Sequence, residues 1–212
     1  MSKLPLICLT AAALAVSACS SVSERDMFAE GDRLEEASRG KKVVRSFEQF
    51  IASPNYSMSR DMWRGAAIEQ YNPSASYVEI MLETQRGRLY INGQVAMDFP
   101  VCSGRFGGSE TPRGTFHITQ KAKDYRSSLY GNFVDAQDNI VQKNAEARNR
   151  APKGAHFRGA SMPYWMRFNG AVGMHVGAVY REGRSHGCVR IPEEACSILF
   201  EKLAVGSKVI VK

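Results

Sequence analysis

The segment Leu89–Met97 predicts a β-hairpin, and no other segment constrains the fold as strongly. Two apolar runs, Leu89-Tyr90-Ile91 and Val95-Ala96-Met97, flank the dipeptide Asn92-Gly93. Asn-Gly favours a two-residue turn because both residues tolerate the positive φ that such a turn requires. We therefore expect antiparallel β-structure around this turn.

From Tyr77 onward, apolar and polar residues alternate with a period of two, which is typical of strands with one buried face. This alternation predicts three further strands, over Val78–Leu82, Gly114–Thr119 and Val209–Val211. In the second of them Phe116 and Ile118 point inward, which leaves His117 on the other face.

Another strand is expected around Val172–Val176. Val172, Met174 and Val176 share one face, so His175 lies on the opposite face, in the run Gly173-Met174-His175-Val176-Gly177.

Pro192-Glu193-Glu194 opens a helix that runs to about Leu203, since proline suits a first helical turn and acidic residues favour the positive end of the helix dipole. Its buried stripe is formed by Ala195, Ile198, Leu199 and Leu203. Strands, hairpins and this one helix predict a mainly β fold, a β-rich sandwich.

Residues 19–76 are interpreted as a tether with helical segments. Val43, Val44, Phe47, Phe50 and Ile51 recur at helical spacing and predict a helix that ends before Pro54. A second, weaker stripe consists of Trp63, Ala67 and Tyr71. Residues 123–160 are mostly polar and lack apolar periodicity, so they are expected to form a lid-like insertion or a mobile loop.

The four residues Ser185-His186-Gly187-Cys188 bring a hydroxyl, an imidazole and a thiol together. A cysteine with a nearby histidine is the minimal device for acyl transfer, and His175 is the candidate base. A protonated histidine beside the thiol can lower its pKa below about 7 and make the thiolate the major form. Gly187 lacks a Cβ, which lets a carbonyl approach the backbone N–H groups near Cys188, the expected oxyanion donors.

Two other interpretations of these residues are open. His175, His186 and Cys188 are possible zinc ligands, but their spacing lacks the paired rhythm of structural zinc sites. A papain-like peptidase places its cysteine before its histidine along the chain, whereas here the candidate base comes first. Both observations favour acyl transfer by another class of enzyme.

The motif Ser-His-Gly-Cys-Val-Arg, preceded by His175, resembles the active-site motif of the L,D-transpeptidases, the YkuD-type catalytic domain. The resemblance extends over about Ser76 to Lys212 and predicts a catalytic domain over residues 77–212. Three more blocks carry it, namely Pro100–Gly104, Glu110–Phe116 and Pro163–Phe168.

The resemblance implies that Cys188 attacks an L,D peptide bond in a peptidoglycan stem peptide, and that an amine acceptor, from another stem or a wall-attached protein, resolves the thioester. His175 is then the base, and His186 orients the site or is structural. Gly187, Ser185 and Arg190 are the candidate oxyanion and substrate-binding residues. No cofactor or metal is required. Trimming by an L,D-carboxypeptidase, cleavage by an endopeptidase and a catalytically silent wall-binding lipoprotein are the alternatives.

The sequence departs from the family in two places. Nine residues separate His175 from Ser185, a shorter spacing than is common in the family. Cys102 replaces a small hydroxyl residue near the expected groove. It either packs as a small residue or forms an oxidation-sensitive bridge with Cys188, which requires Cα atoms within about 7 Å. Cys196 is expected to pack inside the predicted helix.

The N-terminus predicts a lipoprotein signal peptide over residues 1–18. Lys3 precedes the thirteen apolar residues Leu4–Val16, a run too short to span a bilayer. Val16-Ser17-Ala18-Cys19 is similar to a bacterial lipobox with Cys19 as the lipidated residue, and Ser20 then implies the periplasmic face of an outer membrane. Without the signal the net charge falls from +7 to +6. No basic helix or aromatic motif points to nucleic acid. The charge would assist encounter with carboxylate-bearing stem peptides, and solubility explains it equally well.

Overall fold

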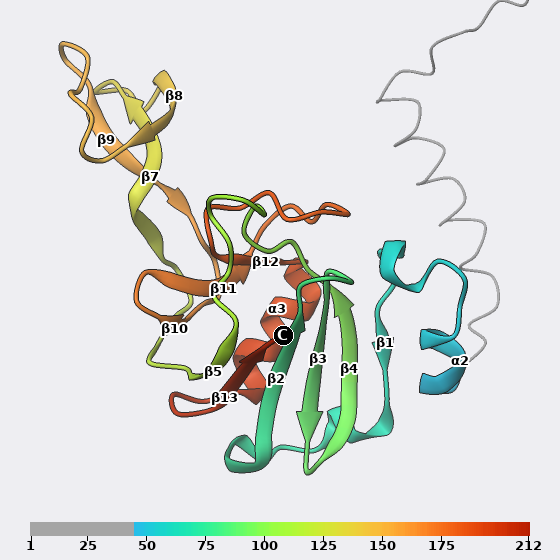
Figure 1. The fold of residues 1–212 in the computed structure, drawn as a ribbon. Coiled ribbons are helices and arrows are strands. Elements are labelled where there is room, and N and C mark those ends of the chain that lie inside the picture. Colours follow the sequence, from blue (N-terminus) through green and yellow to red (C-terminus); the bar gives the residue numbers. More distant parts are fainter. Residues whose placement is uncertain (1–44) are drawn as a thin grey trace, which may run out of the picture. The chain divides into compact units, whose positions relative to one another are not determined.

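The computed structural model describes residues 45–212 (Figure 1). The expected signal peptide, the lipidation site Cys19 and the first part of the expected tether lie outside these residues. Within residues 45–212, no helix is long and apolar enough to cross a membrane.

A six-stranded sheet forms one layer of the fold. Its strands, in spatial order, are β1 (Trp63–Arg64), β4 (Gln94–Pro100), β3 (Arg86–Ile91), β2 (Ser76–Met81), β13 (Lys208–Val211) and β5 (Gly114–His117). The predicted hairpin joins β3 to β4, and its turn residues Asn92 and Gly93 have φ values of 51° and 76°. Asn-Gly therefore fits this turn, which confirms the prediction.

A four-stranded sheet forms the second layer and carries the expected catalytic residues. Its order is β12 (Val189–Ile191), β11 (Val172–Val176), β10 (Trp165–Asn169) and β6 (Gln120–Ala122). Strand β11 pairs antiparallel with β10 and parallel with β12. The loop from β11 to β12 therefore has to cross back along the sheet, and it contains the Ser-His-Gly-Cys motif.

The two sheets share one apolar core, to which helix α3 (Glu193–Lys202) contributes. The core includes Val78 and Ile80 of β2, Met174 of β11, and Leu199 of α3. The stripe predicted for this helix is buried or half-buried, and Cys196 lies in the core as expected. The mainly β sandwich with a helix after the cysteine motif is thus confirmed.

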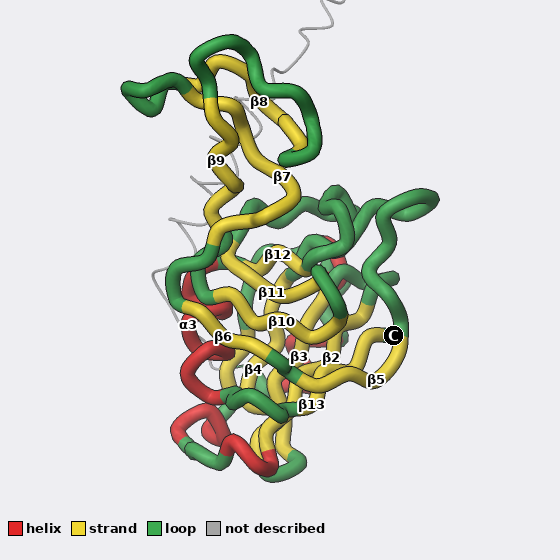
Figure 2. Tube along the Cα trace, turned by 90° about the vertical axis from the view of Figure 1, so that its left-hand side faces the viewer, coloured by secondary structure: helices red, strands yellow, loops and turns green. Residues whose placement is uncertain are grey.

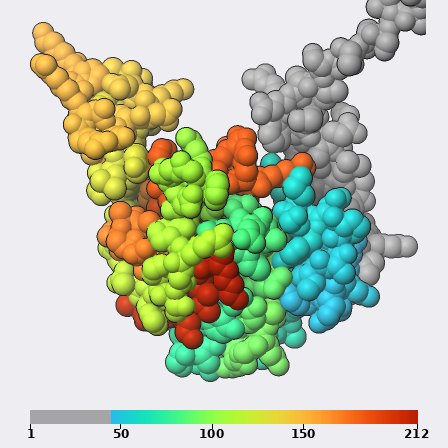
Figure 3. All heavy atoms as spheres, viewed as in Figure 1, coloured from blue at the N-terminus to red at the C-terminus, as the bar shows by residue number. Residues whose placement is uncertain are grey.

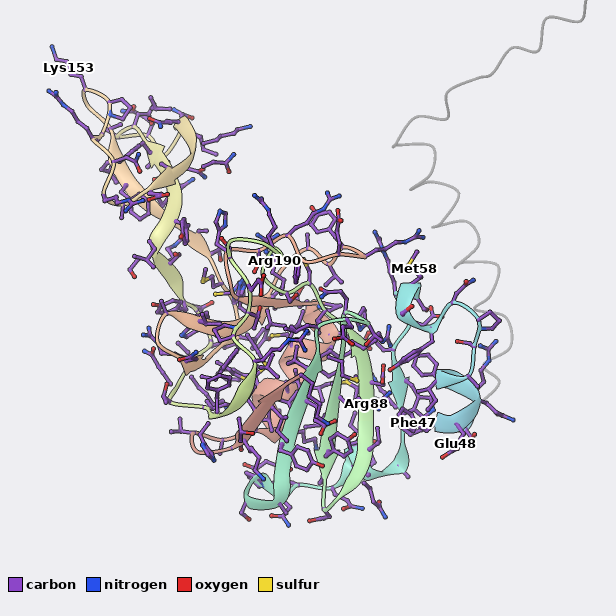
Figure 4. The ribbon with its side chains drawn as sticks, in the orientation of Figure 1. Phe47, Glu48, Met58, Arg88, Lys153 and Arg190 are labelled. Carbon is purple, nitrogen blue, oxygen red and sulfur yellow. The ribbon has the colours of Figure 1, made fainter. Side chains whose placement is uncertain are left out.

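The insertion is an ordered arm and not an irregular loop. It forms a three-stranded sheet of β8 (Ile140–Glu146), β7 (Arg126–Val134) and β9 (His156–Ser161). Figures 1 and 2 show this arm extending away from the two main sheets, and Lys153 lies at its outer end in Figure 4. Strand β8 is largely exposed, and the buried positions of β7 and β9 do not alternate regularly, so no period-two pattern marks these strands in the sequence.

The described part of the expected tether packs on the sandwich. Helix α2 (Phe47–Ile51) confirms the described part of the first helical stripe, and a capping box between Ser46 and Gln49 begins it. Val43 and Val44 of that stripe lie outside the described residues. The second stripe is wrong as a helix, because Trp63 starts strand β1 and the 3₁₀ turn Ala66–Glu69 follows. Pairing with β4 overrides the weak helical spacing, and this segment forms one compact unit with the sandwich.

A buried ion pair joins this N-terminal segment to the sheet. Arg86 donates to Asp98 from Nε at 2.9 Å and from Nη2 at 2.7 Å, and both side chains are fully buried. Asp98 also accepts from Tyr56 at 2.6 Å and from Arg88 at 2.8 Å. Arg86 further donates to the carbonyl oxygens of Ser59 and Asp61. The segment therefore supplies part of the polar partners that a buried charge needs.

Replacing Asp98 with alanine should destabilise the fold strongly. The substitution leaves Arg86 buried without its counter-charge, and the loss in the free energy of unfolding is expected to be about 3–5 kcal/mol. Urea denaturation of the purified protein measures it. Arg64→Ala is the control, because its ion pair with Glu194 is exposed and worth less than about 1 kcal/mol. Similar losses for the two variants would contradict this account.

Candidate active site

A braced turn presents Cys188 at the start of β12. Gly187 has a φ of 115°, a backbone conformation that side-chain-bearing residues rarely adopt. The Ser185 hydroxyl donates to the carbonyl of Cys188 and accepts from the Gly187 N–H at 3.1 Å. Ser185 is buried, and its hydroxyl is therefore engaged in shaping the turn. This arrangement assigns it a bracing role and not the direct substrate contact that we expected.

A second brace comes from Thr111, to which sequence analysis gave no role. Its hydroxyl donates to the carbonyl of Gly187 at 2.7 Å and accepts from the Gly104 N–H at 2.9 Å. Gly104 in turn bridges to Ser185. The signal for Thr111 was its place in the block Glu110–Phe116, but its partners are 7 and 76 residues away in the chain.

Strand β11 holds His175 with a defined tautomer. Its Nδ1 lies 2.8 Å from the carbonyl oxygen of Val176. A carbonyl can only accept, so Nδ1 carries the proton and Nε2 keeps the lone pair that a base needs. Burial lowers the pKa of His175 below the ordinary 6.5, the Val176 carbonyl opposes this shift, and the charge of Arg190 adds to it. His175 is therefore neutral at pH 7.

The parallel pairing of β11 with β12 places the thiol near this base. His175 is the register partner of Arg190, and Met174 is the partner of Val189. Cys188 thus comes one residue before the Met174–Val189 pair, at the level of Gly173, and two residues before Arg190. Side chains two residues apart share a face of a sheet, so Cys188 and Arg190 lie on the same face as His175.

The Cys188 thiol is half-buried and protonated at rest. Burial raises its pKa above the ordinary value of 9.0, and the Gly173 backbone and the charges of Arg190 and Arg167 only partly offset this rise. The expectation of a resting thiolate beside a protonated histidine is therefore wrong. Desolvation disfavours the charged form of both groups, which leaves a neutral thiol and a neutral imidazole.

The two glycines around His175 make room for neighbouring side chains. A Cβ on Gly173 would lie 2.6 Å from the Trp165 ring, and one on Gly177 would lie 3.0 Å from the stem of Arg190. The Trp165 ring centroid is 6.1 Å from that of His175. These glycines therefore let Trp165 and Arg190 pack against the strand, and His175 itself is buried.

The other histidines lie apart from this cluster of His175 and Cys188. His186 is exposed and stacks on Tyr130 of the arm, with ring centroids 4.5 Å apart. His117 is exposed on β5, as predicted, and His156 is exposed at the start of β9. Of the predicted imidazoles, the structure brings only His175 to the strand beside Cys188.

No group of three potential metal-binding side chains occurs in residues 45–212.

The three cysteines of the described chain are free thiols. Cys102 is fully buried and forms an antiparallel bridge with Arg190, two residues beyond Cys188. Such diagonal neighbours are about 7–8 Å apart at Cα, beyond the ~7 Å that a disulfide spans. The Cys102 sulfur instead lies 3.5 Å from the carbonyl oxygen of Glu182. The geometry favours the packing role for Cys102 over the oxidation-sensitive bridge.

Solved structures of L,D-transpeptidases are similar to this chain, and three of them illustrate the likeness. An L,D-transpeptidase (Yku) from Stackebrandtia nassauensis has 22% identity and a TM-score of 0.48, over 68% of this chain and 58% of that one. An L,D-transpeptidase from Mycobacterium smegmatis has 16% identity and a TM-score of 0.48, over 65% and 58%. The catalytic domain of an E. faecium L,D-transpeptidase has 26% identity and a TM-score of 0.45, over 65% and 96%.

The chain thus spans 58% of the length of each of the first two proteins. Among proteins with curated functions, none matches it. The family model of the L,D-transpeptidase catalytic domain matches residues 75–211, which is more than half of the 212-residue chain. This chain belongs to the L,D-transpeptidase catalytic domain family.

Proposed function

We propose that this protein is a peptidoglycan L,D-transpeptidase with Cys188 as its nucleophile and His175 as its base. The observation that carries the proposal is the neutral His175, whose Nδ1 proton is held by Val176 on the strand paired with that of Cys188. A buried neutral imidazole beside a protonated thiol is poised to take the thiol proton.

In the first half-reaction, Nε2 of His175 takes the proton as Sγ of Cys188 bonds to the carbonyl carbon of an L,D peptide bond. The C–N bond then breaks, and His175 returns the proton to the leaving amine of the terminal D-residue. A thioester remains on Cys188. The backbone N–H of Cys188 is the candidate oxyanion donor, and such a donor is typically worth about 3 kcal/mol. The Gly187 N–H, which we also expected to serve, instead donates to the Ser185 hydroxyl at 3.1 Å.

In the second half-reaction, an acceptor amine attacks the thioester carbon. His175 takes the amine proton and passes it to the departing thiolate, which restores the resting state. The acceptor is an amine of another stem or of a wall-attached protein. Incubation of the purified protein with muropeptides, followed by mass analysis, separates transfer from trimming by water, cleavage of cross-links and binding without turnover.

We further propose that the protein acts in the periplasm, anchored through lipid on Cys19, most simply at the outer membrane. The apolar run that ends in Val16-Ser17-Ala18-Cys19 supports this proposal. Several acyl chains on one residue make a stable anchor, whereas one chain binds only marginally. The positive charge of the mature chain favours encounter with carboxylate-bearing stem peptides.

Cys188→Ala should abolish thioester formation and turnover without unfolding the protein. Alanine has no group that can bond to the carbonyl carbon, and the half-buried position loses only one sulfur atom. Intact-protein mass after incubation with a donor tetrapeptide detects the acyl adduct on the wild type. Cys102→Ser is the control: it removes a different thiol, next to Arg190, and should still form the adduct. Turnover by Cys188→Ala would disprove the mechanism.

His175→Ala should slow acylation by about 10²–10⁴ at neutral pH. In the wild type, the rate should fall as the pH drops through the pKa of His175, below 6.5, since only neutral His175 accepts a proton. Without this base the reaction needs the thiolate. In His175→Ala the rise of the acylation rate with pH should therefore move to alkaline pH, above about 9. Acylation rates across pH test both points, with His117→Ala as the control. If the rate of His175→Ala rises over the same pH range as that of the wild type, the base is another residue.

Cys19→Ser should release the protein from the membrane fraction or leave it unprocessed, because serine cannot carry the thioether-linked lipid. Cell fractionation and the N-terminal peptide mass measure this effect. A wild-type chain that is already soluble with an unmodified N-terminus would refute the anchor.

A further inference from the structure

Two loops, residues 101–113 and 177–187, border a cavity that is open to solvent, at the end of the sandwich that carries Cys188. Its volume is about 500 Å³. The loops lie side by side in Figure 3, and two contacts join them: Gly104 bridges to Ser185, and the Arg105 N–H donates to the Ser185 carbonyl at 3.0 Å. The cavity is lined by Arg105, Tyr180, Glu182, Gly183, Arg184 and Arg190.

One of the three arginines is already neutralised by the single acid in the lining. Arg184 donates to Glu182 from Nε at 2.8 Å and from Nη2 at 2.5 Å. Its guanidinium also lies over the Tyr180 ring, 4.9 Å from the centroid. Because Glu182 is engaged in this way, it does not cancel the charge of the remaining two arginines.

Arg105 and Arg190 have no such counter-charge. Within residues 45–212, neither side chain forms an ion pair or a hydrogen bond with another residue. The stem of Arg190 crosses Gly177, where a Cβ would lie 3.0 Å from Cγ. Figure 4 shows Arg190 beneath the loops at this end of the domain. Two guanidinium groups thus face a cavity with their donors unused.

Arg190 relates the cavity to the candidate nucleophile, although Cys188 itself is not among the residues that line the cavity. Arg190 lines it and also lies close enough to Cys188 and His175 for its charge to act on both. A group bound by Arg105 and Arg190 would therefore belong to the same peptide whose carbonyl reaches Cys188, or to the amine that attacks the thioester.

We propose that this cavity binds a free carboxylate of the stem peptide and that Arg105 is the residue that makes it specific for acidic peptides. The planar fork of arginine matches a carboxylate through two parallel hydrogen bonds, and two forks around one cavity can hold one such group. The identity of the peptide rests on the proposed function. The carboxylate belongs to either the donor or the acceptor stem.

Binding to the Cys188→Ala variant tests the cavity without turnover, so its result does not depend on the proposed chemistry. Calorimetry compares a donor tetrapeptide, an acceptor stem peptide and the carboxamide analogue of each. With the Cys188→Ala variant as the parent, the additional substitution Arg105→Gln should weaken binding of a carboxylate peptide about 10-fold or more. Arg105→Lys should weaken it less. The carboxamide analogues should bind weakly and lose nothing further. Arg64→Gln removes an equivalent charge from β1 and should leave binding unchanged.

The peptide that loses affinity identifies the source of the carboxylate. Loss for the donor alone assigns the cavity to the first half-reaction, and loss for the acceptor alone assigns it to the second. The proposal is overturned if Arg105→Gln binds both carboxylate peptides like its parent, if it weakens carboxylate and carboxamide peptides equally, or if neither carboxylate peptide binds the parent.

Discussion

The parallel pairing of β11 with β12 is the constraint on which the candidate site depends. Its register sets His175 opposite Arg190 and places Cys188 two residues before Arg190, on the same face of the sheet. A shift of one residue would turn Cys188 into the core, because side chains alternate between faces. Cys102 strengthens this register through two 2.9 Å backbone hydrogen bonds with Arg190. The turn before Cys188 is then held by Ser185 and Thr111, which act on backbone atoms.

Burial gives this pair of groups its chemistry. In water, a thiol has a pKa about two units above pH 7, and the pKa of a histidine lies close to pH 7. In the sandwich, desolvation moves the pKa of Cys188 up and that of His175 down, so both are neutral over a wide pH range. In the proposed mechanism, His175 therefore takes the thiol proton during the reaction. Arg190 links this pair to the cavity of Arg105, so the proposed carboxylate site and the candidate nucleophile share one charged side chain.

Two segments outside the family's motifs are joined to the sandwich by different forces. The N-terminal segment is attached through buried charge, since Tyr56 and two backbone carbonyl groups complete the partners of Arg86 and Asp98. The arm contacts the catalytic turn through an aromatic stack of Tyr130 on His186. His186, the residue before Gly187, thereby connects the arm to the turn that precedes Cys188, which is consistent with an orienting or structural role and not with the role of the base.

The sequence by itself determined strands β2, β5, β11 and β13, the hairpin at Asn92-Gly93 and the helix after Pro192, because periodicity and turn chemistry are local properties. It also singled out Cys188 and His175 as candidates, because the motif around Cys188 is local. Only the tertiary structure decided the protonation of these groups, since desolvation depends on neighbours from distant strands. The same reason separates Arg105 from Arg184: one is left unpaired and the other is neutralised by Glu182, and no sequence pattern records which arginine finds an acid.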